Sequence, residues 1–193
     1  MSDAIRVGLV GFGYASKTFH APLIGGTPGM ALKAVASSDA DKVHADWPGV
    51  KVMSAPGDLL DDPDIDLVVI ATPNDTHFPL AKAALEAGKH VVVDKPFTVT
   101  LSQARELESL AKHCGRILSV FHNRRWDSDF LTVSALINEG QLGEVCYFES
   151  HFDRFRPQVR QRWREQAGPG SGIWYDLAPH LLDQVVVLFG LPV

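Results

Sequence analysis

Short apolar runs alternate with longer amphipathic stretches through the first 120 residues. The runs are rich in β-branched residues and bounded by turn residues, which is typical of strands buried on both faces. The stretches between them have helical periodicity and end at glycines such as Gly88 and Gly115. We predict strands over 5–10, 32–37, 66–71, 90–94 and 117–121, a short apolar piece over 50–53, and helices after Gly13 and over 78–87 and 101–114. This alternation predicts an α/β fold with a doubly wound parallel sheet.

The pattern changes beyond residue 122. We predict a helix over 130–139, a strand with one exposed face over 144–155, a glycine-rich loop over 166–172 and a helix over 177–189. The chain therefore divides into a dinucleotide-binding domain, 1–122, and a second α+β domain, 123–193. Because a single strand is not stable alone, the second domain is expected to be incomplete.

A glycine loop lies between the first strand and the first helix. Gly11, Phe12 and Gly13 follow the strand directly, and Ser16 takes the place of a third small residue. In a Rossmann fold the first glycine permits the turn, and the second lets the backbone approach a pyrophosphate at the helix N-terminus. The order strand, glycines, helix within a βαβ pattern favours dinucleotide binding over an ordinary glycine turn.

The end of the second strand bears on the choice of cofactor. An acid at this place binds the ribose hydroxyls of NAD, whereas here the residues are Ser37 and Ser38. Two hydroxyl groups without a charge favour the 2′-phosphate of NADP. NAD remains possible, since Asp39 comes next and could still reach the ribose.

Two further strand ends carry candidate site residues. Thr72, Pro73 and Asn74 follow one strand, and Asn74 either reaches the cofactor or makes a turn. Asp94, Lys95 and Pro96 follow another, so Lys95 lies at the edge where open α/β sheets bind ligands. The alternative for Lys95 is an ordinary solvated charge.

Asp176 and His180 are four residues apart on the last predicted helix, so they share one face. A histidine is a natural proton carrier at neutral pH, and Asp183 could hold its second nitrogen. The alternative is an aspartate at a helix start and a histidine satisfied within the core.

Composition excludes several classes of function. The net charge of −5 is mild and argues against nucleic acid and anionic membranes as partners. The two cysteines show no pairing pattern, and neither they nor the histidines have the spacing of a metal site. Without a signal peptide or a long apolar stretch, a cytoplasmic protein is expected.

Four segments together resemble one family. The residues GFGYASKTFHAPL, ATPNDTH, EAGKHVVVDKPF and YDLAPHLLD are similar to the glucose-fructose oxidoreductase, inositol dehydrogenase and MocA (Gfo/Idh/MocA) family. Asp94 stands where glutamate is commoner. The stretches HNRRWDSDF, DRFRPQVRQRWRE and SGIWYDLAPHLLDQ are similar to a branch with NADP-dependent scyllo-inositol dehydrogenases.

The resemblance implies a function and roles for single residues. It implies interconversion of a polyol, cyclitol or sugar hydroxyl and its ketone. Lys95 would hydrogen-bond the reacting hydroxyl and the nicotinamide ribose, His180 would accept the hydroxyl proton, and Asp176 would orient the substrate. Family members continue into a large sheet that forms the subunit interface, so it implies a C-terminally truncated chain and a homo-oligomer in the full-length form. The alternative is a truncated or regulatory dinucleotide-binding protein without activity. Candidates for the substrate wall, if they do not pair with nearby acids, are Arg124, Arg125, Trp126, Arg154 and Trp163.

Overall fold

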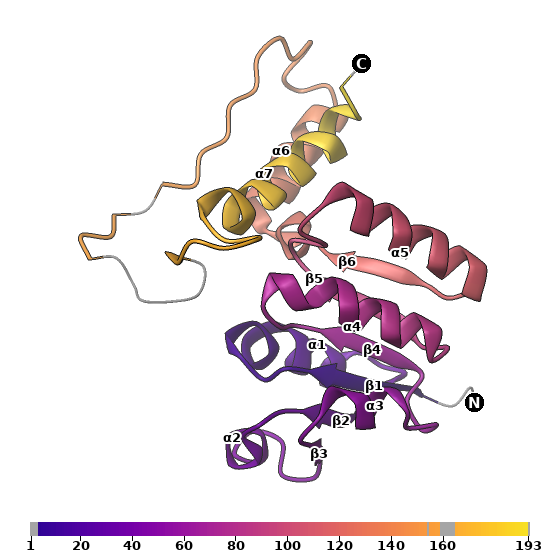
Figure 1. The fold of residues 1–193 in the computed structure, drawn as a ribbon. Helices are drawn as coiled ribbons and strands as arrows, with labels where there is room; N and C mark the ends of the chain where they lie inside the picture. Colours follow the sequence, from indigo (N-terminus) through magenta and orange to yellow (C-terminus); the bar gives the residue numbers. More distant parts are fainter. Residues whose placement is uncertain (1–3, 154, 159–164, 193) are drawn as a thin grey trace. The chain divides into compact units, whose positions relative to one another are not determined.

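The computed structural model describes residues 4–153, 155–158 and 165–192. The chain divides into two compact units, Met1–Phe121 and His122–Val193. Figure 1 shows both units as a ribbon.

The first unit is built on a six-stranded sheet in which every pairing is parallel. Its spatial order is β3-β2-β1-β4-β5-β6, so the direction of winding reverses between β1 and β4. This is the order of the Rossmann fold, and ligands of such sheets bind where the order reverses. The strands are β1 (Ile5–Val10), β2 (Met30–Ala36), β3 (Lys51–Met53), β4 (Leu67–Ile70), β5 (His90–Asp94) and β6 (Leu118–Phe121).

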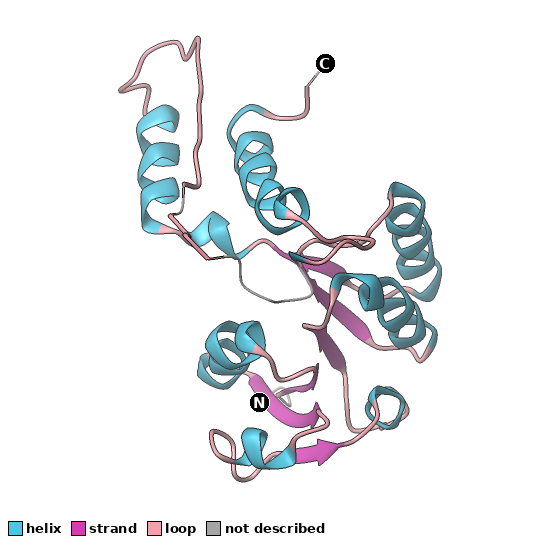
Figure 2. Cartoon of the chain, turned by 60° about the vertical axis from the view of Figure 1, so that its left-hand side comes forward, coloured by secondary structure: helices cyan, strands magenta, loops and turns pink. Residues whose placement is uncertain are grey.

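Helices cover both faces of this sheet, as Figure 2 shows. Neighbouring residues of β4 point to opposite sides: Val68 and Ile70 join one buried cluster, and Val69 joins the other. The first cluster contains Leu59, Leu85 and Leu107, and the second Ala21, Ile24 and Val43. One face is therefore covered by α3 (Pro56–Leu60), α4 (Asn74–Glu86) and α5 (Leu101–Cys114), and the other by η1 (Ser16–His20), α1 (Ala21–Gly26) and α2 (Ala40–His44). The predicted doubly wound fold is confirmed.

The bounds of α5 follow from its end residues. Thr100 Oγ1 accepts a hydrogen bond from the Gln103 N–H, and Gln103 Oε1 accepts one from the Thr100 N–H, both at 3.3 Å. Such a capping box gives acceptors to two backbone N–H groups that have no partner within the helix. The helix ends at Gly115, whose φ of 61° is accessible to glycine at little cost. The predicted range of 101–114 is the observed one.

The second unit is helical where secondary structure is described. It contains the short 3₁₀ helix η2 (Asn123–Trp126), α6 (Ser128–Asn138) and α7 (Ile173–Phe189), which begins four residues before the predicted start at 177. The predicted strand over 144–155 is wrong: residues 145–153 and 155 have no regular secondary structure. An alternating pattern forms a strand only when a neighbour accepts its backbone hydrogen bonds, and the described residues of this unit supply none.

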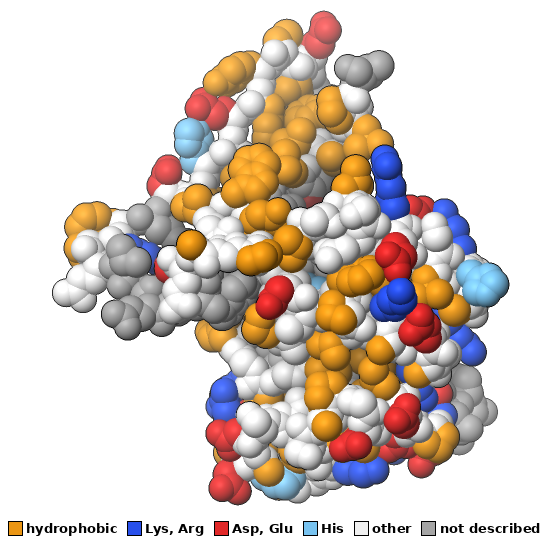
Figure 3. All heavy atoms as spheres, viewed as in Figure 1, with side chains coloured by type: hydrophobic (Ala, Val, Ile, Leu, Met, Phe, Trp, Pro, Cys, Tyr) orange, Lys and Arg blue, Asp and Glu red, His pale blue; other side chains and the backbone are white. Residues whose placement is uncertain are grey.

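Apolar side chains are exposed on the helices of the second unit. Figure 3 shows them gathered over α6 and α7. They include Leu131, Val133, Leu182, Val186, Val187 and Phe189. No described helix is both long and apolar enough to cross a membrane.

Candidate functional site

The predicted residues of the first unit lie at one edge of the sheet. β2, β1, β4 and β5 are consecutive neighbours, and because they run parallel, the loops that follow them emerge at the same edge. These loops carry Gly11, Phe12, Gly13, Ser37, Ser38, Thr72, Pro73, Asn74, Asp94 and Lys95. The fold therefore gathers into one row ten residues that the sequence spreads over 85 positions.

The two glycines of the first loop have different reasons to be glycine. Gly11 has a φ of 88°, and a Cβ there would lie 2.7 Å from the Ala71 carbonyl oxygen, so the fold itself excludes a side chain. At Gly13 a Cβ would meet no protein atom within 4 Å, and its φ is not positive. The protein's own packing thus gives no reason for a glycine at 13, which leaves its backbone open to a ligand.

Ser16 connects this loop with the helix that follows. Its side chain is fully buried, and its Oγ donates a 2.8 Å hydrogen bond to the Gly11 carbonyl oxygen. The Lys17 N–H donates to Gly13 O at 3.0 Å, so helical bonding starts at Gly13. The N–H groups of the first turn have no acceptors within the helix, and such groups are available to an anion.

The loop after β2 places hydroxyl groups at its start. Ser37 is half-buried and Ser38 exposed, and the Ser37 Oγ accepts a 3.2 Å hydrogen bond from the Asp39 N–H. The Asp39 carboxylate accepts from the Lys42 N–H at 3.0 Å and caps α2. The acid next to the serines is therefore engaged with the helix that it starts.

The loop after β4 is held by the first turns of α4. The Thr76 hydroxyl lies 2.6 Å from the Thr72 hydroxyl and 2.7 Å from Pro73 O. Asn74, the first residue of α4, is buried with 3% of its surface exposed. One turn on, His77 is 1% exposed, and its Nε2 lies 3.0 Å from Thr72 O.

The loop after β5 carries the candidate proton-handling lysine. The peptide bond between Lys95 and Pro96 is cis. The Lys95 N–H donates to Asp94 Oδ1 at 2.8 Å, and Asp94 Oδ2 lies 3.7 Å from His20 Nε2. Burial raises the pKa of the Asp94 carboxyl, but the His20 imidazole, the Lys95 N–H and the Lys95 charge outweigh burial, so the net pKa lies below its usual value. Asp94 is therefore ionised at neutral pH.

The other two candidate residues lie on α7 in the second unit. Asp176 is in the first turn, where a carboxylate is stabilised by the helix dipole, and His180 follows four residues later on the same face. His180 is 6% exposed, and its ring centroid lies 6.4 Å from that of Phe152. The helix thus presents an acid and an imidazole side by side.

Asp183, expected as a partner for His180, binds an arginine. Arg125 Nε donates to Asp183 Oδ2 at 2.7 Å, and Arg125 Nη2 donates to Oδ1 at 2.6 Å. The Asp183 side chain is 10% exposed. In addition, the Gln184 amide donates to Arg124 O at 3.1 Å, so two side chains of α7 are tied to η2.

Both arginines considered for the substrate wall pair with acids. Arg125 binds Asp183, and Arg124 Nη1 donates to Asp127 Oδ2 at 2.6 Å while its guanidinium lies over the Phe152 ring. Trp126 is 76% exposed. Arg154 and Trp163 lie outside the described residues.

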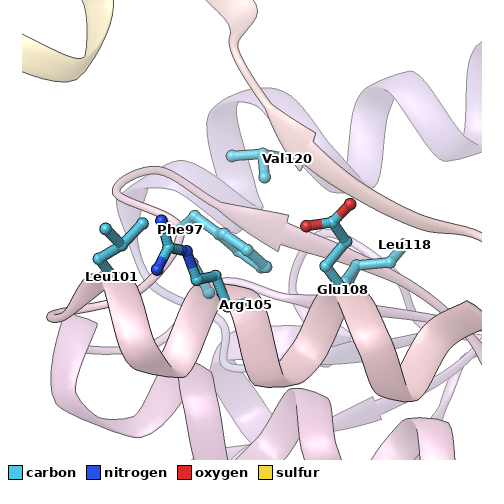
Figure 4. A pocket seen from close by; sticks show the side chains of 7 residues that line it. Phe97, Leu101, Arg105, Glu108, Leu118 and Val120 are labelled. Atoms are coloured by element: carbon cyan, nitrogen blue, oxygen red, sulfur yellow. The ribbon is translucent and has the colours of Figure 1, made fainter.

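A groove of about 360 Å³ lies between α5 and β6. Figure 4 shows Phe97, Leu101, Leu118 and Val120 lining it, with Arg105 and Glu108 on the helix side. It contains none of the predicted site residues. Among the described residues, no group of three or more His, Cys, Asp or Glu side chains could hold a metal ion.

Comparison with known proteins identifies the family. Residues 5–122 match the Gfo/Idh/MocA oxidoreductase family, NAD-binding Rossmann fold, and residues 134–193 match the C-terminal alpha/beta domain of the same family. The chain belongs to the Gfo/Idh/MocA oxidoreductase family. The predicted membership is confirmed.

Three relatives of this Gfo/Idh/MocA chain show how much of the family it spans. It is 79% identical over its whole length to the uncharacterized oxidoreductase YdgJ of Escherichia coli, covering 56% of that protein. Over 98% of its length it is 40% identical to the scyllo-inositol 2-dehydrogenase (NADP(+)) IolW of Bacillus subtilis, covering 53% of it. A solved Yersinia pestis oxidoreductase, YPO2259, matches the whole chain with a TM-score of 0.93 and 71% identity, over 54% of that structure. The chain spans about half the length of these relatives.

A nicotinamide dinucleotide fits the Gfo/Idh/MocA chain's own residues. The open space beside Gly13 and the N–H groups of the following helical turn suit a pyrophosphate. The hydroxyls of Ser37 and Ser38 suit the adenosine ribose end, and the loops after β4 and β5 continue the row toward Lys95. A dinucleotide would be held along this edge and would supply the hydride acceptor.

Two residues of the first unit went unnoticed in the sequence. His20 and His77 are buried and contact the loop that contains Lys95. Neither has metal-ligand spacing or an acid four residues away on the same predicted helix face, so the sequence pattern did not single them out. A usable signal was their position, because each lies within about two helical turns of a strand-end loop, where a side chain can reach back to the edge of the sheet.

Proposed function

We propose that this chain forms the NADP-binding part, and the start of the substrate-binding part, of a dehydrogenase that interconverts a polyol, cyclitol or sugar hydroxyl and its ketone. The observation that carries the proposal is Gly13, a glycine that the fold does not require, directly before a helix start and in line with Lys95 at the same sheet edge. The Bacillus subtilis relative is named a scyllo-inositol 2-dehydrogenase (NADP(+)). This name supports a cyclitol as the class of substrate and NADP as the cofactor.

NADP is favoured over NAD by the residues after β2. The place of the ribose-binding acid is taken by Ser37 and Ser38, and the nearby Asp39 carboxylate already accepts a helix N–H. A carboxylate facing a 2′-phosphate would cost affinity by charge repulsion, whereas hydroxyl donors stabilise it.

Within this proposal the three candidate catalytic residues have separate tasks. Lys95 hydrogen-bonds the reacting hydroxyl oxygen and the nicotinamide ribose, His180 accepts the hydroxyl proton, and Asp176 orients the substrate. A bound NADP⁺ supplies the hydride acceptor when the alcohol is oxidised. The protein's part is therefore to orient the substrate and manage one proton.

Binding and turnover test the proposal separately. NADPH fluorescence should show saturable binding to the 193-residue chain, and reduction of NADP⁺ should be followed with scyllo-inositol and a panel of other cyclitols and sugars. Turnover that Lys95→Met abolishes supports the dehydrogenase. Binding without turnover supports a dinucleotide-binding protein that is not catalytic, and absence of NADPH and NADH binding overturns the proposal.

A further inference from the structure

We propose that His77 and His20 are positioning residues that hold the loop of Lys95 and couple it to the two loops at which the dinucleotide binds. The inference rests on the proposed function, because it assigns Lys95 its task. Both histidines are in the first unit, on helices that follow neighbouring strands of the sheet.

His77 bridges two strand-end loops through its imidazole ring. Its Nδ1 lies 2.8 Å from Pro96 O, and its Nε2 lies 3.0 Å from Thr72 O. Both partners are carbonyl oxygens, so only a ring nitrogen that carries a proton can donate to either of them. A neutral ring donates one hydrogen bond, to Pro96 O or to Thr72 O, and its other nitrogen lies against the second carbonyl oxygen.

The bridge acts directly on the residue next to Lys95. Pro96 is buried and directly follows Lys95 in the chain, so its carbonyl group lies one residue beyond the lysine. With His77 itself 1% exposed and packed in the core, the ring cannot follow a displaced loop without opening the protein. His77 therefore limits the movement of the lysine backbone relative to Thr72.

His20 supports the same loop at Asp94, the residue before Lys95. It is 3% exposed, its Nε2 lies 3.7 Å from Asp94 Oδ2, and its ring centroid lies 4.3 Å from that of Phe121. Asp94 in turn accepts the Lys95 N–H at 2.8 Å. One histidine therefore acts on the residue before Lys95, and the other on the residue after it.

The helices that carry these histidines connect the Lys95 loop with the two loops proposed to bind the dinucleotide. His20 ends η1, the helical turn that begins just after the glycine loop, and His77 is on α4, which begins at the Thr72–Asn74 loop. A ligand that orders either loop thereby also orders the Lys95 loop. Displacement of a reacting group by about 1 Å can cost on the order of a hundredfold in rate, so such coupling matters for a proton-handling residue.

Hydrogen exchange in the absence of any dinucleotide tests the coupling itself. His77→Leu removes the imidazole and its hydrogen bond, and we expect the N–H groups of Lys95 and Phe97 to exchange on the order of tenfold faster, which corresponds to one lost hydrogen bond. The N–H groups of β1 and β2 should keep the parent rates. His77→Gln, whose amide can still donate, should restore part of the protection. His113→Gln, at an exposed position of α5, is the matched control and should change nothing.

Binding of two probes separates a positioning role from a general loss of structure. We expect His77→Leu to weaken NADPH binding on the order of tenfold, and to leave the affinity for adenosine 2′,5′-bisphosphate, which lacks the nicotinamide half, unchanged. Asp94→Asn should accelerate exchange at Lys95 in the same way, because the ionised carboxylate that accepts the Lys95 N–H is lost.

The outcomes distinguish this inference from the proposed function. Parent-like exchange at Lys95 and Phe97 in His77→Leu overturns the inference, and so does acceleration that spreads equally to β1 and β2. If the parent chain binds neither probe, the proposed function is wrong, while the exchange experiment still decides the coupling. If His77→Leu does not fold, the same comparison is made between His77→Gln and parent, with unchanged exchange again overturning the inference.

Discussion

Arg6 and Asp66 join the amino ends of the neighbouring strands β1 and β4 by a two-point ion pair. Arg6 Nη2 lies 2.7 Å from Asp66 Oδ1, and Arg6 Nε lies 2.9 Å from Oδ2. The Arg6 backbone N–H also donates to Oδ2 at 2.9 Å. The hydrogen bonds from the Arg6 side chain and N–H lower the pKa of Asp66 to about 2.

This ion pair predicts a pH dependence of stability. The folded pKa of Asp66 is below its unfolded value of 3.8, so its contribution is fully present above about pH 4 and is lost as the pH falls toward 2. The side chain is 37% exposed, so after solvent screening we expect a contribution of about 1 kcal/mol. Asp66→Asn should lower the free energy of unfolding by that amount at pH 7 and by little at pH 2, measured by urea denaturation.

Asp64 is the matched control for this experiment. Its carboxylate lies 2.8 Å from Arg6 Nη1, but its side chain is 83% exposed. Asp64→Asn should change the unfolding free energy by less than about 0.5 kcal/mol at any pH. Equal effects of the two substitutions would contradict the assignment of the pH dependence to Asp66.

The two glycines of the first loop should respond differently to alanine. Gly11→Ala places a Cβ 2.7 Å from Ala71 O at a positive φ, so we expect a loss of about 1–3 kcal/mol in stability. Gly13→Ala meets no protein atom and should leave the unfolding free energy within about 0.5 kcal/mol of the parent. It should nonetheless weaken NADPH binding on the order of tenfold or more, because its methyl group occupies the space proposed for the pyrophosphate. Denaturation and NADPH titration of both variants check this, and undiminished NADPH binding by Gly13→Ala would contradict it.

The serines after β2 predict a preference for NADP. NADPH should bind at least about tenfold more tightly than NADH, since charge-assisted hydrogen bonds to a phosphate are worth about 1.5–3 kcal/mol each. Ser37→Asp should reduce the preference by adding a repelling charge, and Ser37→Asn, which adds none, is the control. Fluorescence titration with both cofactors measures the ratio, and equal affinities in the parent chain would refute the assignment.

Lys95 and His180 should affect turnover more than binding. With a substrate that the chain oxidises, Lys95→Met should keep the NADPH affinity and lower kcat by about 10²–10⁴, the range for one proton-handling group. His180→Ala should lower kcat similarly but recover in part at high pH, where solvent base can accept the proton. A kcat near that of the parent for Lys95→Met would remove it from the mechanism.

Arg125 should stabilise α7 through Asp183. Arg125→Met leaves a carboxylate that is only 10% exposed without its two-point partner, which should cost about 1–3 kcal/mol. Faster hydrogen exchange of the α7 N–H groups would report this loss. Arg125→Lys keeps the charge but not the planar fork, so its effect should be intermediate, and unchanged exchange in both variants would show that the pair does not hold the helix.

Local pattern was enough to predict the Rossmann sheet. The central strands β1, β4 and β5 are short runs rich in β-branched residues, and α5 has its own cap at Thr100 and its glycine stop at Gly115. The prediction of a strand over 144–155 was wrong because local pattern was not enough there. Alternation shows which face of a strand would be buried, but not whether another strand is present to form hydrogen bonds with it.

The sequence by itself determined the residue types at the strand ends: the glycines at 11 and 13, the serines at 37 and 38, and Lys95. Only the tertiary structure decided how these residues are supported. His77 contacts the carbonyl oxygen of Pro96, 19 positions away in the sequence, and Arg125 donates hydrogen bonds to Asp183, 58 positions away. Such pairs depend on which helices and loops pack together, and because a histidine or an arginine can bond to many partners, its residue type does not reveal which one the fold brings within 3 Å.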